Sequence, residues 1–170
     1  MVLLKENKDF KWSVIKDNFL SQDECGKLKE HLRNSKNKIN RVYVTELDDK
    51  WLVDRAWMTF KLANTLHWKF DIDGFKDIVG LYYRKGEFTE DYALHSDFAS
   101  SEDKTATFKL TGVLFLNDDF DGGELKILRG KVKPKPGRLV MYPAFAAHQV
   151  LKCNGDRFTI VFQVEGNCFV

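Results

Sequence analysis

Residues Phe108 to Leu116, FKLTGVLFL, form the stretch of sequence that decides the fold. Apolar side chains occupy both alternating faces of this run, which is typical of a strand inside a sheet that is covered on both sides. Turn signals lie on its C-terminal side, NDDFDGG at 117–123 and VKPKPG at 132–137, and short strand-like segments lie between them. A series of about eight short strands at such spacing predicts a β-sandwich or jelly roll.

Six further segments after residue 77 carry strand signals, because they alternate polar and apolar residues or are rich in β-branched and aromatic ones. They are 78–84, 92–98, 124–128, 138–142, 147–152 and 157–164. The chain also has 14 phenylalanines in 170 residues, which suits a β-rich core. We therefore expect a jelly-roll region over residues 78–166.

The first 77 residues carry mainly helical signals. Ser21 followed by Glu24 is a capping box, and it predicts a helix that ends near Arg33. The other expected elements are a strand at 10–19, a polar turn at 34–40, a strand at 41–47 and a second helix, capped by Asp48-Asp49, that runs from Trp51 to about Phe70. The expected fold class is α+β and mainly β: a jelly roll, or double-stranded β-helix, with N-terminal helices packed on one sheet. We expect a single domain, 1–170, in which 1–77 supports the jelly roll of 78–166.

Composition excludes several classes of protein. The chain is 44% hydrophobic and 31% charged, as in ordinary globular domains, and its net charge of +2 is too small to indicate a nucleic-acid binder. Three cysteines without a CxxC pair indicate ordinary thiols in a reducing compartment. The N-terminal residues become charged too early for a signal peptide, and there is no apolar run of membrane-spanning length. We expect a cytoplasmic protein without a membrane partner.

His95-Ser96-Asp97 and the distant His148 are the candidate metal ligands. On a strand, residues i and i+2 point to the same side, so His95 and Asp97 can bind one ion together. A jelly roll readily brings a distant strand with His148 alongside. Two imidazoles and one carboxylate suit iron(II) better than zinc, and they leave the opposite coordination positions open for substrate and oxygen.

Arg157 is the candidate anion-binding residue. It begins the alternating segment RFTIVF, which places Arg157, Thr159 and Val161 on one face of a strand. If this face lines the interior, Arg157 is a buried cation that requires an anion. Its guanidinium offers a bidentate fork to a carboxylate, and Thr159 could add a hydrogen bond. A dicarboxylate co-substrate would satisfy both residues.

Together these motifs resemble those of the iron(II)/2-oxoglutarate-dependent dioxygenase superfamily, and most closely its prolyl 4-hydroxylase-like branch. The resemblance covers roughly residues 78–166. It rests on the combination His95-x-Asp97, Leu116-Asn117, Gly122-Gly123-Glu124-Leu125, Pro136-x-Arg138-Leu139, His148 and Gly155-x-Arg157. It implies an oxidoreductase with Fe(II) as cofactor, 2-oxoglutarate and O2 as co-substrates and ascorbate as a reductant.

The resemblance also implies a role for each site residue. The metal ligands and catalytic residues would be His95, Asp97 and His148, with Arg157 binding the distal carboxylate of 2-oxoglutarate. Tyr83 matches a tyrosine whose hydroxyl contacts the co-substrate, and Tyr92 matches one near the metal on the substrate side. Some relatives carry another co-substrate-binding tyrosine where this chain has Phe115. Anion binding would then depend more on Arg157, Tyr83 and a threonine hydroxyl, from Thr111 or Thr159.

The resemblance implies hydroxylation of an unactivated C–H bond, with release of succinate and CO2. The leading hypothesis for the substrate is a prolyl or other side chain of a peptide or protein, and the alternative substrate is a free amino acid or small metabolite. A nucleic-acid demethylase is disfavoured, because Gln163 stands where that branch has a second arginine. A weaker alternative, from a different class, is a non-catalytic jelly-roll binding module that retains a metal. Substrate choice is expected to depend on Arg41–Asp49 and on the loop Ala99–Thr107, a candidate lid.

Overall fold

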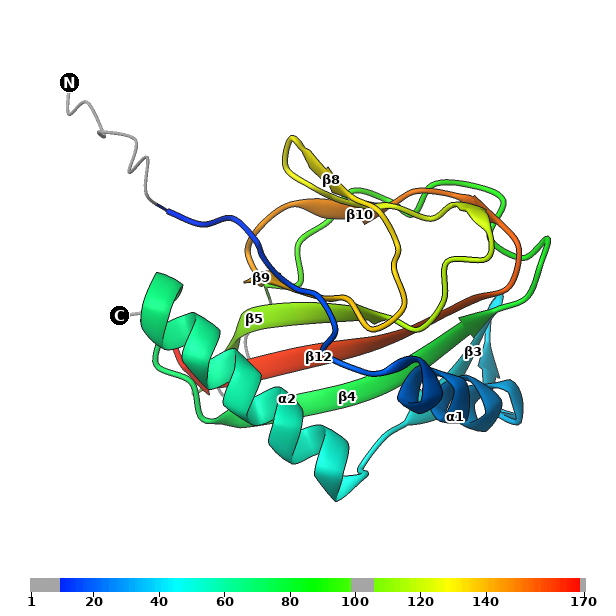
Figure 1. Ribbon diagram of the computed structural model, residues 1–170. Coiled ribbons are helices and arrows are strands. Elements are labelled where there is room, and N and C mark those ends of the chain that lie inside the picture. The colour runs from blue at the N-terminus through cyan, green and yellow to red at the C-terminus, as the bar shows by residue number, and fades with distance from the viewer. Residues whose placement is uncertain (1–9, 99–105, 169–170) are drawn as a thin grey trace.

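A seven-stranded antiparallel sheet is the larger layer of the computed structural model, which describes residues 10–98 and 106–168 (Figure 1). Its strands run in the order β1-β9-β5-β12-β4-β3-β2. Their bounds are Val14–Lys16 (β1), Lys38–Ile39 (β2), Val42–Glu46 (β3), Gly74–Tyr83 (β4), Ala106–Phe115 (β5), Leu139–Pro143 (β9) and Arg157–Asn167 (β12). The stretch that decides the fold is thus β5, which lies between β9 and β12.

Shorter strands form the second layer. One sheet has the order β10-β7-β8, and a separate pair joins β11 to β6. Their bounds are Asp121–Gly122 (β6), Leu125–Ile127 (β7), Gly130–Val132 (β8), His148–Val150 (β10) and Cys153–Asn154 (β11). Figure 1 shows these strands opposite one face of the larger sheet and both helices on its other face. The expected mainly β jelly roll with helices on one sheet is confirmed.

The first helix begins and ends where the sequence predicts. Helix α1 spans Gln22–Arg33, and Ser21 is its N-cap. The Ser21 hydroxyl accepts a hydrogen bond from the Glu24 amide at 3.2 Å, and the Glu24 carboxylate accepts one from the Ser21 amide at 2.8 Å. This reciprocal pair is the predicted capping box. Helix α2 spans Lys50–Ala63 and continues as a π-helical turn, η1, over Asn64–Trp68.

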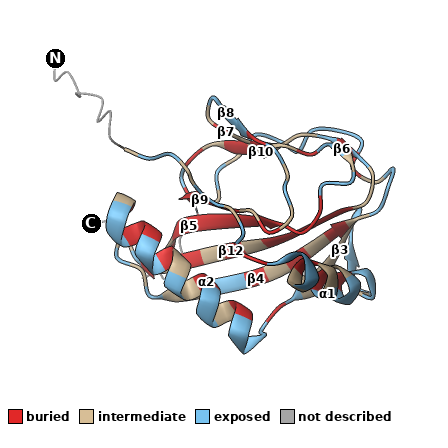
Figure 2. Cartoon of the chain, viewed as in Figure 1, coloured by how far each residue is buried: buried red, intermediate tan, exposed pale blue. Residues whose placement is uncertain are grey.

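The larger hydrophobic core lies between the helices and the seven-stranded sheet, where Figure 2 shows buried residues on the facing sides of both layers. Two glycines in the sheet make this close packing possible. A Cβ atom at Gly80 would lie 2.1 Å from a methyl carbon of Leu32 in α1, and one at Gly112 would lie 2.4 Å from the ring of Phe60 in α2. The helices therefore contact the sheet backbone at these two points.

Replacing Gly112 by alanine should destabilise the fold by about 1–3 kcal/mol, because the fully buried Phe60 ring must move to admit the new methyl group. Chemical denaturation of the two proteins measures this difference. Gly26→Ala is the matched control: nothing lies within 4 Å of the place that its new methyl group would take on α1, so alanine should stabilise by about 0.5–1 kcal/mol. Equal stability of Gly112→Ala and wild type would contradict this packing.

Two sequence expectations need correction. The sequence predicts a regular strand at 92–98, but within this segment the structure shows one isolated bridge, between His95 and His148. The polar stretch 34–40 has the pattern of a turn, but it contains the two-residue strand β2, which pairs with β3. Most of the candidate lid at Ala99–Thr107 lies outside the described residues, and its last two residues belong to β5.

Candidate metal centre

Two segments that are distant in sequence, residues 92–98 and 144–150, bring the candidate ligands together. The extended segment around His95 runs beside β10, and the backbones of His95 and His148 exchange two hydrogen bonds, of 3.1 and 2.8 Å. Two residues on, the amide of Asp97 donates to the carbonyl of Ala144 at 2.9 Å. These bonds hold His95 and Asp97 with their side chains on the same side although the segment is not a regular strand.

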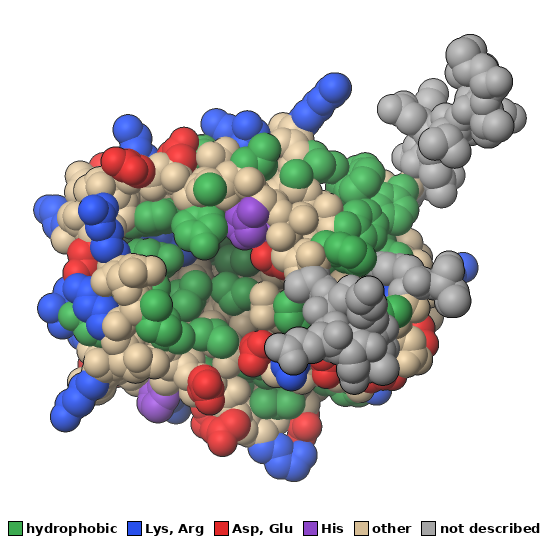
Figure 3. All heavy atoms as spheres, turned by 180° about the vertical axis from the view of Figure 1, so that it is seen from behind, with side chains coloured by type: hydrophobic (Ala, Val, Ile, Leu, Met, Phe, Trp, Pro, Cys, Tyr) green, Lys and Arg blue, Asp and Glu red, His purple; other side chains and the backbone are tan. Residues whose placement is uncertain are grey.

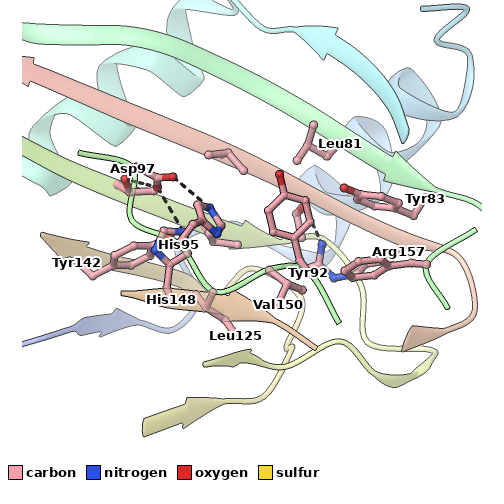
Figure 4. Close-up of a pocket in the computed structure, with 15 residues that line it drawn as sticks. Leu81, Tyr83, Tyr92, His95, Asp97, Leu125, Tyr142, His148, Val150 and Arg157 are labelled. Carbon is pink, nitrogen blue, oxygen red and sulfur yellow. Dashed lines mark hydrogen bonds and ion pairs between the residues drawn. The ribbon is translucent and has the colours of Figure 1, made fainter. Parts of the chain in front are cut away.

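The three side chains converge on one point (Figure 4). His95 Nε2 lies 3.4 Å from Asp97 Oδ1, and His148 Nε2 lies 3.4 Å from Asp97 Oδ2. One ligand atom from each of the three residues lies within 4.8 Å of the other two. Among the described residues, no other group of three His, Cys, Asp or Glu side chains converges in this way. Two imidazole nitrogens and a carboxylate so arranged can bind a single metal ion and leave its other positions open.

Both imidazoles are held in an orientation that suits a metal ligand. His95 Nδ1 lies 2.8 Å from the carbonyl oxygen of Ala93, and His148 Nδ1 lies 3.0 Å from that of Ala146. A carbonyl can only accept, so each Nδ1 donates to it, and a neutral ring in this position carries its lone pair on Nε2, the nitrogen nearest Asp97. Burial lowers the pKa of His148, which favours the neutral imidazole that a metal requires.

Arg157 lies in the same pocket and is 2% exposed. Its guanidinium is flanked by the rings of Phe88 and Phe115, at 5.9 and 5.7 Å, and burial lowers its pKa to about 10. It therefore remains a cation at neutral pH. Nη1 donates to the hydroxyl of Thr159 at 3.3 Å, but Nε and Nη2 have no hydrogen-bond partner among the described residues. A buried cation with free donors is a site for an anion.

The two predicted tyrosines also line this pocket, which has a volume of about 240 Å³. Tyr83 on β4 is paired across the sheet with Arg157, and burial raises the pKa of its hydroxyl, so it remains a hydrogen-bond donor. The Tyr92 ring lies 5.0 Å from that of His95 and is half exposed. Figure 3 shows the corresponding face of the molecule hollowed and lined mainly by hydrophobic side chains. The structure thus brings together all six predicted site residues, while their roles remain predictions.

Two supporting residues differ from what the sequence suggests. Thr111 is a candidate donor to the anion by its sequence position, but its hydroxyl instead donates to Asp97 Oδ2 at 2.8 Å. Asn117 enters the sequence argument only as a motif residue. Its amide nitrogen donates to the carbonyl of Asp156 at 2.8 Å, and its oxygen accepts from the amide of Phe158 at 2.9 Å. Asn117 therefore fixes the backbone on both sides of Arg157.

Comparison with protein families agrees with this geometry. The model of the 2OG-Fe(II) oxygenase superfamily, where 2OG is 2-oxoglutarate, matches residues 80–164, which contain all six site residues. The chain belongs to the 2OG-Fe(II) oxygenase superfamily. As a member it is an oxygenase with iron(II) as cofactor and 2-oxoglutarate as co-substrate, so the predicted enzyme class and cofactors are confirmed. The donor set and the anion site described above fit both groups.

Several solved structures share the fold of this 2OG-Fe(II) oxygenase. It is similar to the 2OG complex of the viral collagen prolyl hydroxylase of Paramecium Bursaria Chlorella virus-1, with a TM-score of 0.74, 20% identity and coverage of 92% and 96% of the two chains. For a Pseudomonas putida prolyl-4-hydroxylase the TM-score is 0.70 and the identity 19%, with 94% of this chain and 94% of that chain covered. A third similar structure is a Trichoplax adhaerens prolyl hydroxylase in complex with a hypoxia inducible factor oxygen degradation domain peptide fragment. Its TM-score is 0.69 and the identity 18%, with 93% of this chain and 84% of that chain covered. No curated protein sequence matches the chain.

Two further expectations concern membranes and cysteines. Within residues 10–98 and 106–168, no helix of this oxygenase is long and apolar enough to cross a membrane. Cys25 and Cys153 are buried, and no disulfide joins cysteines within the described residues. That the three cysteines are ordinary thiols stays a prediction.

Replacing Thr111 by valine should weaken iron(II) binding by about tenfold, because the carboxylate of Asp97 loses the hydrogen bond that orients it. Anaerobic titration with iron(II) measures the affinity. Thr111→Ser keeps the hydroxyl and should bind iron as wild type does. If the valine and serine variants bound iron equally well, the hydroxyl would have no part in orienting Asp97.

Proposed function

We propose that this oxygenase is a prolyl 4-hydroxylase-like hydroxylase, which acts on a prolyl side chain of a peptide or protein and releases succinate and CO2. The observation that carries the proposal is the buried, partly unpaired Arg157 in the same pocket as three converging metal ligands. One cleft thus offers a place for a metal and a place for a carboxylate. Residues 1–170 would act as one catalytic domain.

In this proposal each group has a distinct task. His95, Asp97 and His148 hold the iron, which supplies the redox chemistry that couples decarboxylation of 2-oxoglutarate by O2 to oxidation of a C–H bond. Arg157 binds the distal carboxylate of 2-oxoglutarate through its free Nε and Nη2, and Thr159 and Tyr83 can donate further hydrogen bonds. Phe88 and Phe115 beside the guanidinium exclude water, which strengthens this ion pair.

A peptide substrate is favoured by the surroundings of the pocket. A second hollow of about 630 Å³ shares Tyr83, Phe88 and Tyr92 with the first, and it extends to residues 39–42 and 87–93. An extended chain whose target side chain enters the pocket can lie along this hollow. The similar Trichoplax adhaerens protein was solved with a peptide. Arg41 and Val42 line the hollow, which supports a role in substrate choice for that end of Arg41–Asp49.

Mass spectrometry tests the proposed substrate class. The enzyme is incubated with iron(II), 2-oxoglutarate and ascorbate, together with a collagen-like peptide, a second proline-containing peptide or a mixture of free amino acids. We expect a gain of one oxygen atom on a peptide proline, with an equal amount of succinate, and no product without 2-oxoglutarate. Oxidation of a free amino acid in place of the peptides would instead establish the metabolite hydroxylase.

A further inference from the structure

The loop between β9 and β10 contacts two of the three candidate metal ligands through its backbone. The carbonyl of Ala144 accepts the hydrogen bond from the amide of Asp97 at 2.9 Å. The carbonyl of Ala146 lies 3.0 Å from Nδ1 of His148. The residue between these two carbonyls is Phe145. Any movement of this loop would therefore displace Asp97 and turn the ring of His148.

Aromatic residues from two other parts of the chain hold the side chain of Phe145. Phe10 stacks on it with 6.5 Å between ring centroids, while Trp12 at 6.2 Å and Phe70 at 6.1 Å meet it edge to face. Phe10 and Trp12 also contact each other, at 4.8 Å. We call these four residues the aromatic clamp. Such offset and edge-to-face pairs are directional, so the clamp fixes where the Phe145 ring lies.

The segment that carries two clamp residues is itself anchored. Trp68, in the π-helical turn after α2, donates a hydrogen bond from its indole nitrogen to the carbonyl of Lys11 at 2.6 Å. Trp68 is buried in the larger core. Lys11 lies between Phe10 and Trp12, so this bond ties both rings to the end of η1. Figure 1 shows the blue N-terminal segment running past the end of β9 on its way to α1.

The position of Phe145 sets it apart from an ordinary core residue. Its side chain is 38% exposed, and it is not one of the buried residues that make up either hydrophobic core. Phe10 and Phe70, by contrast, pack against the larger core. Core filling therefore accounts for two members of the clamp but not for Phe145. The ring contacts of Phe145 instead fix the position of the loop whose carbonyls contact Asp97 and His148.

We propose that Phe145 is a positioning residue for the metal centre, held by the aromatic clamp so that Ala144 and Ala146 orient Asp97 and His148. This inference rests on the proposed role of those two residues as iron ligands. The clamp acts on iron binding and not on the co-substrate anion, because Arg157 and its supporting residue Asn117 belong to other elements. Phe145 is thus expected to change the affinity for iron while leaving the overall fold intact.

Anaerobic iron(II) titration, combined with thermal unfolding of the metal-free protein, tests the proposal. Phe145→Ala should bind iron about tenfold more weakly than wild type, and Phe145→Tyr, which keeps the ring, should bind as wild type does. Trp51→Ala is the matched control: Trp51 is 41% exposed on α2, outside the clamp, and its loss should leave iron affinity unchanged. The metal-free Phe145→Ala and Trp51→Ala proteins should unfold at similar temperatures.

Trp12→Ala provides a second route, because it removes part of the clamp without altering the loop. It should weaken iron binding in the same direction as Phe145→Ala. If wild type binds iron and both Phe145→Ala and Trp12→Ala bind it equally well, the clamp has no positioning role. If Phe145→Ala fails to fold, Trp12→Ala alone decides: iron affinity equal to that of wild type would show that the clamp has no positioning role. If wild type itself bound no iron, the proposed function would fail first.

Discussion

The His148→Ala variant is expected to form no measurable succinate. His148 supplies one of three ligand atoms, and it is the buried one of the two histidines, fixed through Nδ1 by the carbonyl of Ala146. Alanine leaves one imidazole and one carboxylate, which hold iron(II) weakly and without a fixed geometry. The measurement is succinate release in the presence of saturating 2-oxoglutarate, together with iron affinity.

His31→Ala is the control for this variant. His31 is exposed on α1, on the helical side of the larger sheet, and its replacement should leave both succinate release and iron affinity unchanged. Turnover retained by His148→Ala would remove His148 from the ligand set. The structure would then hold two candidate ligands, His95 and Asp97, instead of a complete iron site.

The second large effect is expected for Arg157→Ala, which should bind 2-oxoglutarate far more weakly. Loss of one partner of a buried, hydrogen-bonded charge pair costs about 2–5 kcal/mol, or roughly 30-fold to several thousand-fold in Kd. Iron affinity should stay near that of wild type, because no hydrogen bond or ion pair joins Arg157 to the described ligand residues. Separate titrations with iron(II) and with 2-oxoglutarate measure the two affinities.

Arg157→Lys separates charge from geometry. Lysine keeps the positive charge but lacks the planar fork, so its affinity for 2-oxoglutarate should lie between those of wild type and Arg157→Ala. A loss of iron binding in Arg157→Ala would contradict the account, because it would make Arg157 a structural support of the metal centre. Unchanged affinity for 2-oxoglutarate would remove Arg157 from the anion site.

Features that depend on neighbours in sequence were predictable. The capping box at Ser21 and Glu24 involves residues three apart, and α1 begins and ends as expected. The alternation at Arg157 and Thr159 correctly predicted that both side chains share one buried face. The spacing of His95 and Asp97 likewise indicates that their side chains point to one side. In the structure, backbone hydrogen bonds to His148 and Ala144 produce this arrangement, and the segment is not a regular strand.

The supporting contacts around the site join residues that are distant in sequence, and patterns along the chain do not predict them. Thr111 lies 14 residues from the carboxylate of Asp97 that it binds, and Asn117 lies about 40 residues from the backbone groups it holds around Arg157. A strand threonine and a turn asparagine carry no local signal of such roles. Phe145 likewise looks like one more apolar residue in the sequence, and only the fold places it against Phe10 and Trp12.

The most direct test of the account is an anaerobic titration of the wild-type protein with iron(II) in the presence of 2-oxoglutarate, followed by visible absorption. Binding of both groups in one pocket, the iron at His95, Asp97 and His148 and the distal carboxylate at Arg157, predicts a metal-to-ligand charge-transfer band that saturates at one iron per chain. The band should be weaker at the same 2-oxoglutarate concentration in Arg157→Ala and absent in His148→Ala. Iron binding by wild type with no such band at saturating 2-oxoglutarate would contradict the account.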